Sequence, residues 1–176
     1  KQGRVAIPGF YDAVKDASTW EQDQVCQLGI TKEKLAESLG VPALRSEEGY
    51  SVLDQIRMRP TFEVNGIYGG YSGEGSKTII PSKVTAKISC RLVPDQDPSQ
   101  ILDLVGSWLE SQVPAGVTIK VTKGHSGSPY GVLPPQAPGS SVAADSPLGR
   151  AFLACEQAIE QATGNPPLYL REGGSI

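Results

Sequence analysis

Residues 83–92, "KVTAKISCRL", alternate between apolar and polar side chains more regularly than the neighbouring stretch "FEVNGIYGG". A β-strand places successive side chains on opposite faces, so this spacing predicts a strand with one face toward a core. The apolar positions are Val84, Ala86, Ile88, Cys90 and Leu92; the polar positions are Thr85, Lys87, Ser89 and Arg91. The pattern therefore predicts a sheet with one buried face and one polar face.

The elements around this strand predict the rest of the architecture. A strand is expected at 62–69 and another at 117–121, "VTIKV", because both stretches alternate. Between them Asp97 is placed to cap a helix that begins with Pro98 and continues through apolar residues to Leu109. The order strand, strand, helix, strand predicts an α+β two-layer sandwich, an antiparallel sheet with helices on one face.

The flanking regions differ in character from this central part. The first fifty residues contain helix-start signals, among them Ser18 with Glu21 and Thr31, and Gly40 is a predicted helix end. From residue 124 the chain is rich in Gly, Pro and Ser without periodicity, which indicates a linker. A further helix is expected from Ser146, followed by a strand "LYL" at 168–170.

Composition excludes several classes of function. The net charge is −3 with both signs interspersed, so there is no basic surface pattern typical of nucleic-acid binding, and no apolar run approaches a membrane span. The three cysteines, Cys26, Cys90 and Cys155, are an odd number at wide spacings and indicate reduced thiols in a cytoplasmic protein. We expect neither a nucleic-acid partner nor a membrane.

Several catalytic motifs can be tested and fail. "GGYSGEGSKT" at 69–78 misses the phosphate-binding loop because Ser76 separates Gly75 from Lys77. "GHSGS" and "GYSGE" both miss the nucleophile elbow of serine hydrolases by one position. His125 is the only histidine, so the chain alone cannot form the usual ligand set of a hydrolytic zinc site. We predict no catalytic residue and no metal ligand in this chain.

Two residues have side chains suited to binding an anionic ligand. Arg91 lies on the polar face of the predicted strand, where its guanidinium could bind a carboxylate bidentately or could simply be solvated. Ser175 follows two glycines and could present its hydroxyl to an anion or could only complete a turn. The residue types alone leave both alternatives open.

Four motifs in order carry a resemblance to a known family: G-x-G-x-K-T at 73–78, I-P-x-K at 80–83, R-L-V-P at 91–94 and R-E-G-G-S at 171–175. Together they resemble the dinuclear-zinc metallopeptidases that include carnosine dipeptidase, aminoacylase, carboxypeptidase G and succinyl-diaminopimelate desuccinylase. The dipeptidase branch is the most similar. "RVAIPGFYDAV", "KLAESLGV" and "GHSGSPYGV" also have counterparts there, so the resemblance covers essentially the whole chain.

The resemblance implies a division of the chain into four parts. Residues 1–58 lead into a ferredoxin-like lid or dimerisation domain, residues 59–123 form its core, 124–145 are a linker, and 146–176 begin the C-terminal part of the catalytic α/β domain. It also implies that Thr78, Arg91, Gly174 and Ser175 bind the substrate's carboxylate. The two zinc ions and the glutamate base of the family would be held outside this chain, and the enzyme would form a homodimer through the lid.

The chain begins at Lys1 inside an apolar stretch and stops at Ile176 just after a glycine turn, so we expect a fragment of a longer enzyme, inactive alone. The favoured function is part of a zinc-dependent exopeptidase that hydrolyses small peptides. One alternative is a stand-alone dimerisation or interaction module. The other is an N-acyl-amino-acid deacylase of the same family.

Overall fold

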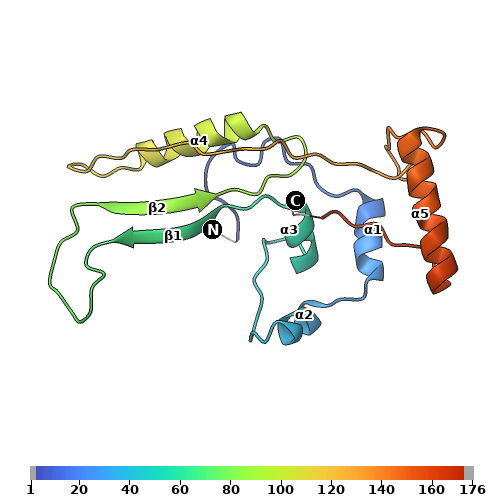
Figure 1. Cartoon of the computed structure of the whole chain (residues 1–176), viewed down its shortest axis with the longest axis horizontal. Helices are drawn as coiled ribbons and strands as arrows, with labels where there is room; N and C mark the ends of the chain where they lie inside the picture. Colours follow the sequence, from blue (N-terminus) through green and yellow to red (C-terminus); the bar gives the residue numbers. More distant parts are fainter. Residues whose placement is uncertain (1–2, 173–176) are drawn as a thin grey trace.

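The computed structural model describes residues 3–172, and the predicted site residues Gly174 and Ser175 therefore lie outside the described part. Within that part the chain is an α+β structure, as predicted, with two strands and five helices (Figure 1). In chain order they are α1 (Thr19–Gln27), α2 (Lys32–Ser38), α3 (Val52–Met58), β1 (Glu63–Gly69), β2 (Val84–Ser89), α4 (Pro98–Ser111) and α5 (Pro147–Thr163). No helix within residues 3–172 is long and apolar enough to cross a membrane.

The two strands form an antiparallel hairpin whose register is shifted by a bulge at Asn65. Val64 pairs with Ile88, and Gly66 then pairs with Lys87, so β1 has one residue more than β2 at this point. As a result Ile67, three residues after Val64, lies on the same face as Val64 and Ile88. The bulge thus explains why the alternation of "FEVNGIYGG" is imperfect while both strands still share an apolar face.

The predicted helix-start signals are confirmed. The Ser18 hydroxyl accepts from the backbone N–H of Glu21, whose carboxylate accepts from the N–H of Ser18 at 2.9 Å, which is a complete capping box. Asp97 accepts from the N–H of Gln100 at 2.8 Å and caps α4. Gly40, just after α2, has a φ of +66°, the left-handed conformation that favours glycine at a helix end.

The core lies at the base of the hairpin, where the chain enters β1 and leaves β2. Ile7, Phe10 and Ile101 are buried together there, which brings the N-terminal segment against the first turn of α4. Side chains from the hairpin base, the N-terminal segment and α4 pack around these three: Val5, Tyr11, Phe62, Cys90, Leu92, Leu104, Val105 and Trp108. Burial of this apolar surface fixes α4 beside the hairpin.

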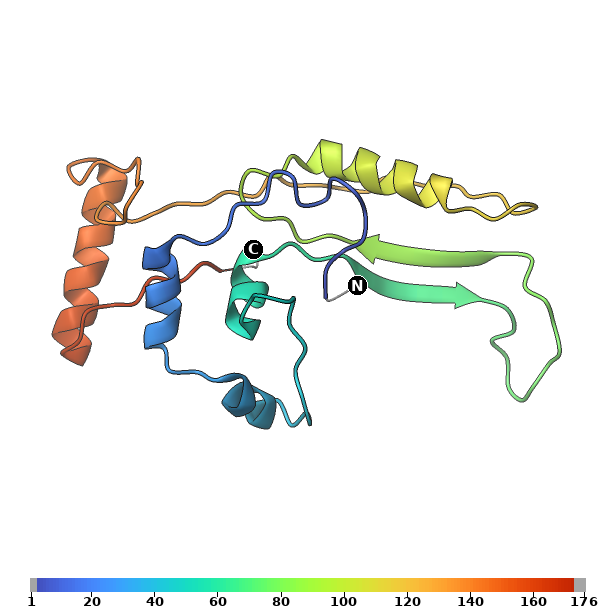
Figure 2. The same ribbon diagram turned by 180° about the vertical axis from the view of Figure 1, so that it is seen from behind.

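The predicted strand at 117–121 is wrong for the described structure. Figures 1 and 2 show this segment running beside α4, on the β2 side of the hairpin, and Val121 packs 3.7 Å from the Cβ position of Gly106 in α4. A strand requires a neighbour for its backbone hydrogen bonds, and β2 pairs only with β1 among residues 3–172. "LYL" at 168–170 is likewise extended without a strand partner.

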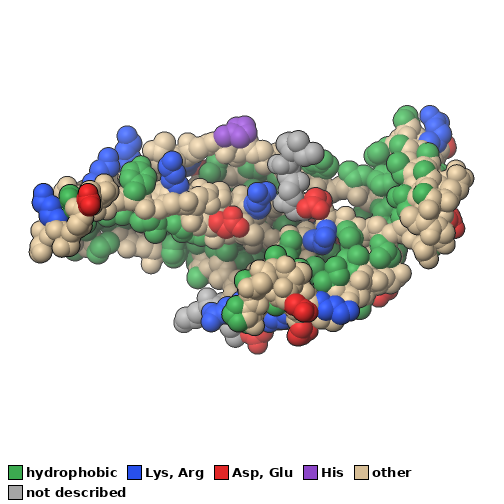
Figure 3. All heavy atoms as spheres, turned by 60° about the horizontal axis from the view of Figure 1, so that its bottom comes forward, with side chains coloured by type: hydrophobic (Ala, Val, Ile, Leu, Met, Phe, Trp, Pro, Cys, Tyr) green, Lys and Arg blue, Asp and Glu red, His purple; other side chains and the backbone are tan. Residues whose placement is uncertain are grey.

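The hairpin projects away from the four helices α1, α2, α3 and α5, so the molecule is elongated (Figures 1 and 2). The apolar face of the hairpin is open from Val64, which is 51% exposed, toward the tip, where Ile67 is 69% and Val84 61% exposed. Hydrophobic side chains are visible at the surface in both halves of the view in Figure 3. The described residues therefore bury the base of the hairpin and leave its outer part uncovered.

A buried ion pair joins the N-terminal region to the start of the hairpin. Nε and Nη2 of Arg59 donate to the two carboxylate oxygens of Glu47 at 2.9 and 2.8 Å, and the side chains are only 4% and 2% exposed. The Arg59 guanidinium also lies over the rings of Tyr50 and Tyr11, at 4.2 and 4.9 Å from their centroids. Because Arg59 precedes β1 by a few residues, this network holds the hairpin against residues 4–50.

Candidate functional site

Arg91 lies immediately after β2, at the base of the hairpin. Its backbone is fixed by Thr61, because the N–H of Thr61 donates to the carbonyl of Arg91 at 2.9 Å and the N–H of Arg91 donates to Oγ1 of Thr61 at 3.3 Å. The residue is exposed, and its guanidinium makes no ion pair with any residue of the described part. A rigid backbone with an uncommitted guanidinium is the arrangement that a carboxylate-binding arginine requires.

Thr78 lies at the opposite end of the hairpin, in the connection between β1 and β2, and is also exposed. Between Thr78 and Arg91 runs the whole of β2, whose six residues span roughly 20 Å at 3.3 Å per residue. Figure 1 shows the connection beyond the far end of the strands from the base. One copy of the described chain therefore does not bring Thr78 and Arg91 to the same carboxylate.

A shallow hollow lies next to Thr78. It has a volume of about 380 Å³ and is formed by the ends of the two strands and the residues after Thr78, among them Tyr68, Ile79, Ile80 and Pro81. Ile80 is 96% exposed, so the hollow is open, and polar and apolar groups line it in similar measure, with Lys83 as the charged group. This surface has the character of a contact surface more than that of an enclosed reaction site.

The segment before Gly174 and Ser175 is described as far as Glu172, and side chains of α1 and α3 hold it. Nε of Arg171 donates to Oε1 of Glu21 at 2.6 Å, and the backbone N–H of Tyr169 donates to Oε1 of Gln24 at 3.0 Å. From α3, Nη1 of Arg57 donates to the carbonyl of Arg171 at 2.9 Å. The chain that leads to Ser175 is thus anchored to the N-terminal helices.

Glu21 is the central residue of this anchor and is almost fully buried. Burial acts to raise the pKa of its carboxyl, but hydrogen bonds from Arg171 and Ser18 outweigh burial and hold the pKa below its ordinary value of 4.5. A depressed pKa in the folded state means that the ionised carboxylate stabilises the fold above its unfolded pKa. This stabilisation is lost as the pH falls through the folded value.

We therefore expect the difference in unfolding free energy between wild type and Glu21→Gln to be largest near pH 7 and to shrink below pH 4.5, where the wild-type carboxyl becomes protonated. Urea unfolding of both proteins at pH 7 and at acidic pH measures the difference. Glu37→Gln, at an exposed position in the last turn of α2, is the matched control for removing a glutamate charge. A difference that is the same at both pH values would contradict the ionised pair.

The described residues bring no metal centre together, and the partly buried thiol of Cys90 is a poor nucleophile. Burial raises the pKa of the Cys90 thiol to about 11, with a further contribution from Glu63, so the thiol is protonated at neutral pH. His125 is exposed in the segment after 117–121. Nowhere in residues 3–172 do three or more His, Cys, Asp or Glu side chains come together as a metal could require. The residues of this chain that are described do not fit a zinc site.

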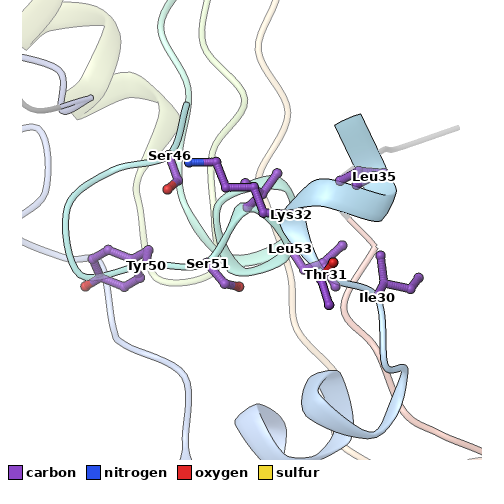
Figure 4. Close-up of a pocket in the computed structure, with 9 residues that line it drawn as sticks. Ile30, Thr31, Lys32, Leu35, Ser46, Tyr50, Ser51 and Leu53 are labelled. Atoms are coloured by element: carbon purple, nitrogen blue, oxygen red, sulfur yellow. The ribbon is translucent and has the colours of Figure 1, made fainter. Parts of the chain in front are cut away.

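A second hollow, of about 180 Å³, lies between α2 and α3 and contains none of the predicted site residues (Figure 4). The hydroxyls of Thr31 and Ser51 line it, but each already accepts a backbone N–H as a helix cap. Lys32 extends toward Ser46 across it (Figure 4). Because its polar groups are largely committed to the fold, this hollow offers little to a ligand.

The comparisons with known proteins assign this combination of hairpin and helix to a family. The family model for the peptidase dimerisation domain matches residues 27–117, so the chain belongs to the M20 peptidase dimerisation domain family. The match includes the whole hairpin and α4.

Curated relatives and solved structures agree with this assignment. The chain is 29% identical over 177 residues to the Cys-Gly metallodipeptidase DUG1 of Candida albicans and 26% identical over 179 residues to the Beta-Ala-His dipeptidase of Rattus norvegicus. Each alignment covers 99% of this chain but only 34% and 33% of the relative. The chain thus spans about a third of the length of these relatives.

Among solved structures, the M20 family metallo-carboxypeptidase Sso-CP2 from Sulfolobus solfataricus superposes with a TM-score of 0.74 at 28% identity, covering 98% of this chain and 36% of that one. Human carnosine dipeptidase 1 superposes with a TM-score of 0.73 at 25% identity, and the superposition covers 99% of this chain and 35% of that one. The family resemblance inferred from the four sequence motifs is confirmed.

Sequence reasoning named Arg91 and Thr78, which stay predictions, and it missed the residues that hold the chain before Gly174 and Ser175. Glu21 was visible only as a helix-capping residue, and its contact with Arg171 spans 150 positions. Arg57 had no signal in the sequence, because its partner lies 114 positions away. Contacts of this kind follow from the fold and not from a local pattern.

Proposed function

We propose that this chain is the dimerisation and substrate-recognition part of a zinc-dependent dipeptidase that hydrolyses small peptides. The observation that carries the proposal is Arg91, a residue with a fixed backbone and an uncommitted guanidinium in a chain of the peptidase dimerisation family. The relatives of this chain include metallodipeptidases. The zinc ions would act on the scissile amide elsewhere in the longer protein, since the described residues form no metal site.

In this proposal Arg91, Gly174 and Ser175 bind the substrate's carboxylate from one copy of the chain, and Thr78 reaches the same carboxylate from a second copy. Thr78 and Arg91 are separated by the length of β2, which supports their binding the carboxylate from different copies. The open apolar tip of the hairpin, with Ile67 and Ile80 exposed, supports a contact there with another copy. A homodimer would then be required for a complete carboxylate site.

A cytoplasmic location fits the same proposal, because Cys26, Cys90 and Cys155 are all free thiols, as in proteins of reducing compartments. The deacylase alternative differs only in the group that is released from the amino acid. The carboxylate contact of Arg91 would serve both substrates, so the assay below must include both.

The activity is tested with the full-length protein on a panel of dipeptides and N-acyl amino acids, with and without a metal chelator. We expect hydrolysis of dipeptides that is abolished by the chelator and restored by added zinc. Faster hydrolysis of the acyl amino acids would favour the deacylase. Hydrolysis that persists undiminished in the chelator, or no hydrolysis of either class, would contradict the proposal.

A further inference from the structure

Thr61 and Arg91 face each other where the ladder of the hairpin ends. The last pair of the ladder is Glu63 with Ser89, and the same register, continued by two residues on each strand, places Thr61 opposite Arg91. In an antiparallel ladder the two residues of a hydrogen-bonded pair exchange two backbone hydrogen bonds. Here the N–H of Thr61 donates to the carbonyl of Arg91 at 2.9 Å, but the N–H of Arg91 donates to the side-chain Oγ1 of Thr61 at 3.3 Å. The threonine hydroxyl thus takes the place of a backbone acceptor.

The hold on Arg91 therefore depends on which side chain stands at position 61. Threonine supplies a hydroxyl oxygen as the acceptor, whereas valine has the same shape and no polar atom at that place. Thr61 is half-buried, so its hydroxyl lies at the edge of the packed hairpin base. The side chain of Thr61, and not only its backbone, contributes to the position of Arg91.

The neighbours of both residues are packed into the core. Phe62 follows Thr61, and Cys90 and Leu92 stand on either side of Arg91; all three pack around the buried cluster at the hairpin base. Because successive side chains of an extended chain point to opposite faces, Arg91 is directed away from that core, and it is exposed. The guanidinium therefore extends from a backbone that packing holds on both sides and that the Thr61 hydroxyl holds from the facing strand.

Thr61 is itself fixed by the chain that precedes it. Arg59, two residues earlier, is buried in the ion pair with Glu47 and has an extended backbone (φ −114°, ψ 138°), as a residue before proline prefers. Pro60, between them, is buried and has a restricted φ. The fold thus determines where the Thr61 hydroxyl lies.

We propose that Thr61 is a positioning residue for Arg91, whose hydroxyl holds the Arg91 backbone so that the guanidinium meets the substrate carboxylate with both of its parallel N–H donors. The inference rests on the proposed function. Thr61 acts through Arg91 and need not touch the substrate. A bidentate pair depends on the direction of the guanidinium as well as on its charge, so loss of the hydroxyl should weaken recognition of the carboxylate while the charge remains.

The test uses the full-length enzyme with Thr61→Val and Thr61→Ser, assayed on a dipeptide and on its C-terminal amide. Thr61→Val should lower kcat/KM on the acid by roughly fivefold to thirtyfold, mainly through KM, and should change kcat/KM on the amide by less than about twofold. Valine is common in strands, so the hairpin base should still form. Thr61→Ser keeps the acceptor and should stay within about threefold of wild type on both substrates.

Thr31→Val is the matched control, because the Thr31 hydroxyl accepts the backbone N–H of Lys34 at the same distance of 3.3 Å, but as the cap of α2. This control should leave the preference for the acid over the amide unchanged. Adding Thr61→Val to Arg91→Ala should cause no further loss on the acid relative to the amide, because the guanidinium to be positioned is gone. A further loss in the double variant would show that Thr61 acts independently of Arg91 and would overturn the inference.

Three other results would overturn the inference: equal losses on both substrates in Thr61→Val, an unchanged preference for the acid in that variant, or a loss in Thr61→Ser as large as in Thr61→Val. The proposed function survives each of them if Arg91→Ala still erases the preference for the acid. If Arg91→Ala leaves that preference in place, the proposed function fails and this inference fails with it.

Discussion

Replacing Arg91 with alanine in the full-length enzyme should lower kcat/KM on a free-carboxylate dipeptide by roughly thirtyfold to several thousandfold. The reason is that truncating one partner of a desolvated charge pair costs about 2 to 5 kcal/mol, much of it from leaving the carboxylate unpaired. Arg91 is suited to that role because Thr61 fixes its backbone from both sides. Kinetics on the acid and on its C-terminal amide measure the effect.

The C-terminal amide of the dipeptide shows whether Arg91 binds the carboxylate, because the amide lacks the negative charge that the guanidinium would bind. Arg91→Ala should erase the wild-type preference for the acid, and Arg91→Lys should restore only part of it, since lysine keeps the charge and loses the bidentate geometry. Lys87→Ala, at an exposed position of β2, is the control for removing a positive charge from the same strand. If the preference survives intact in Arg91→Ala, Arg91 does not bind the carboxylate.

Replacing Glu47 with glutamine should destabilise the fold by up to about 5 kcal/mol, because it leaves the buried guanidinium of Arg59 with only the exposed Asp16 carboxylate, 3.4 Å from its Nη1, as a counter-charge. Both side chains are almost completely buried, at 2% and 4% exposure, so water cannot replace the lost partner. Urea unfolding of the variant and the wild type measures the difference.

The exposed pair of Lys15 with Asp95 provides the control for this measurement. Its side chains are 74% and 47% exposed, and Lys15→Gln should cost less than about 1 kcal/mol. A cost for Glu47→Gln as small as that of the control would show that the Glu47–Arg59 pair does not hold the N-terminal region to the hairpin.

Local signals in the sequence predicted local structure well. The caps at Ser18 and Asp97 and the left-handed Gly40 are where the sequence places them, because each depends only on residues within one turn. The alternation of 83–92 predicted β2 for the same reason. The prediction of a strand at 117–121 was wrong. A strand needs a neighbouring strand for its backbone hydrogen bonds, and the alternation of side chains does not show whether such a neighbour is present.

For the candidate site, the sequence indicated residue chemistry, which stays a prediction, and it did not indicate geometry. The strand pattern marked Arg91 as a residue that could bind a carboxylate, and the family motifs added Thr78. The strand predicted at 83–92 already separated the two residues, but the sequence did not show that the connection carrying Thr78 lies beyond the far end of the strands. Likewise no local pattern marks Glu47 and Arg59 as a pair, and only the fold buries them together, with Arg59 over the rings of Tyr11 and Tyr50.

The most direct test of the account is to mix two impaired variants of the full-length enzyme, Arg91→Ala and Thr78→Glu, which places a negative charge where the substrate carboxylate should bind. If each site takes Arg91 from one subunit and Thr78 from its partner, every mixed dimer contains one intact site. After equal amounts of the two are unfolded and refolded together, activity should return to roughly a quarter of wild type, because random pairing makes about half of the dimers mixed. Activity that stays at the level of the separate variants would contradict a carboxylate site shared between two copies.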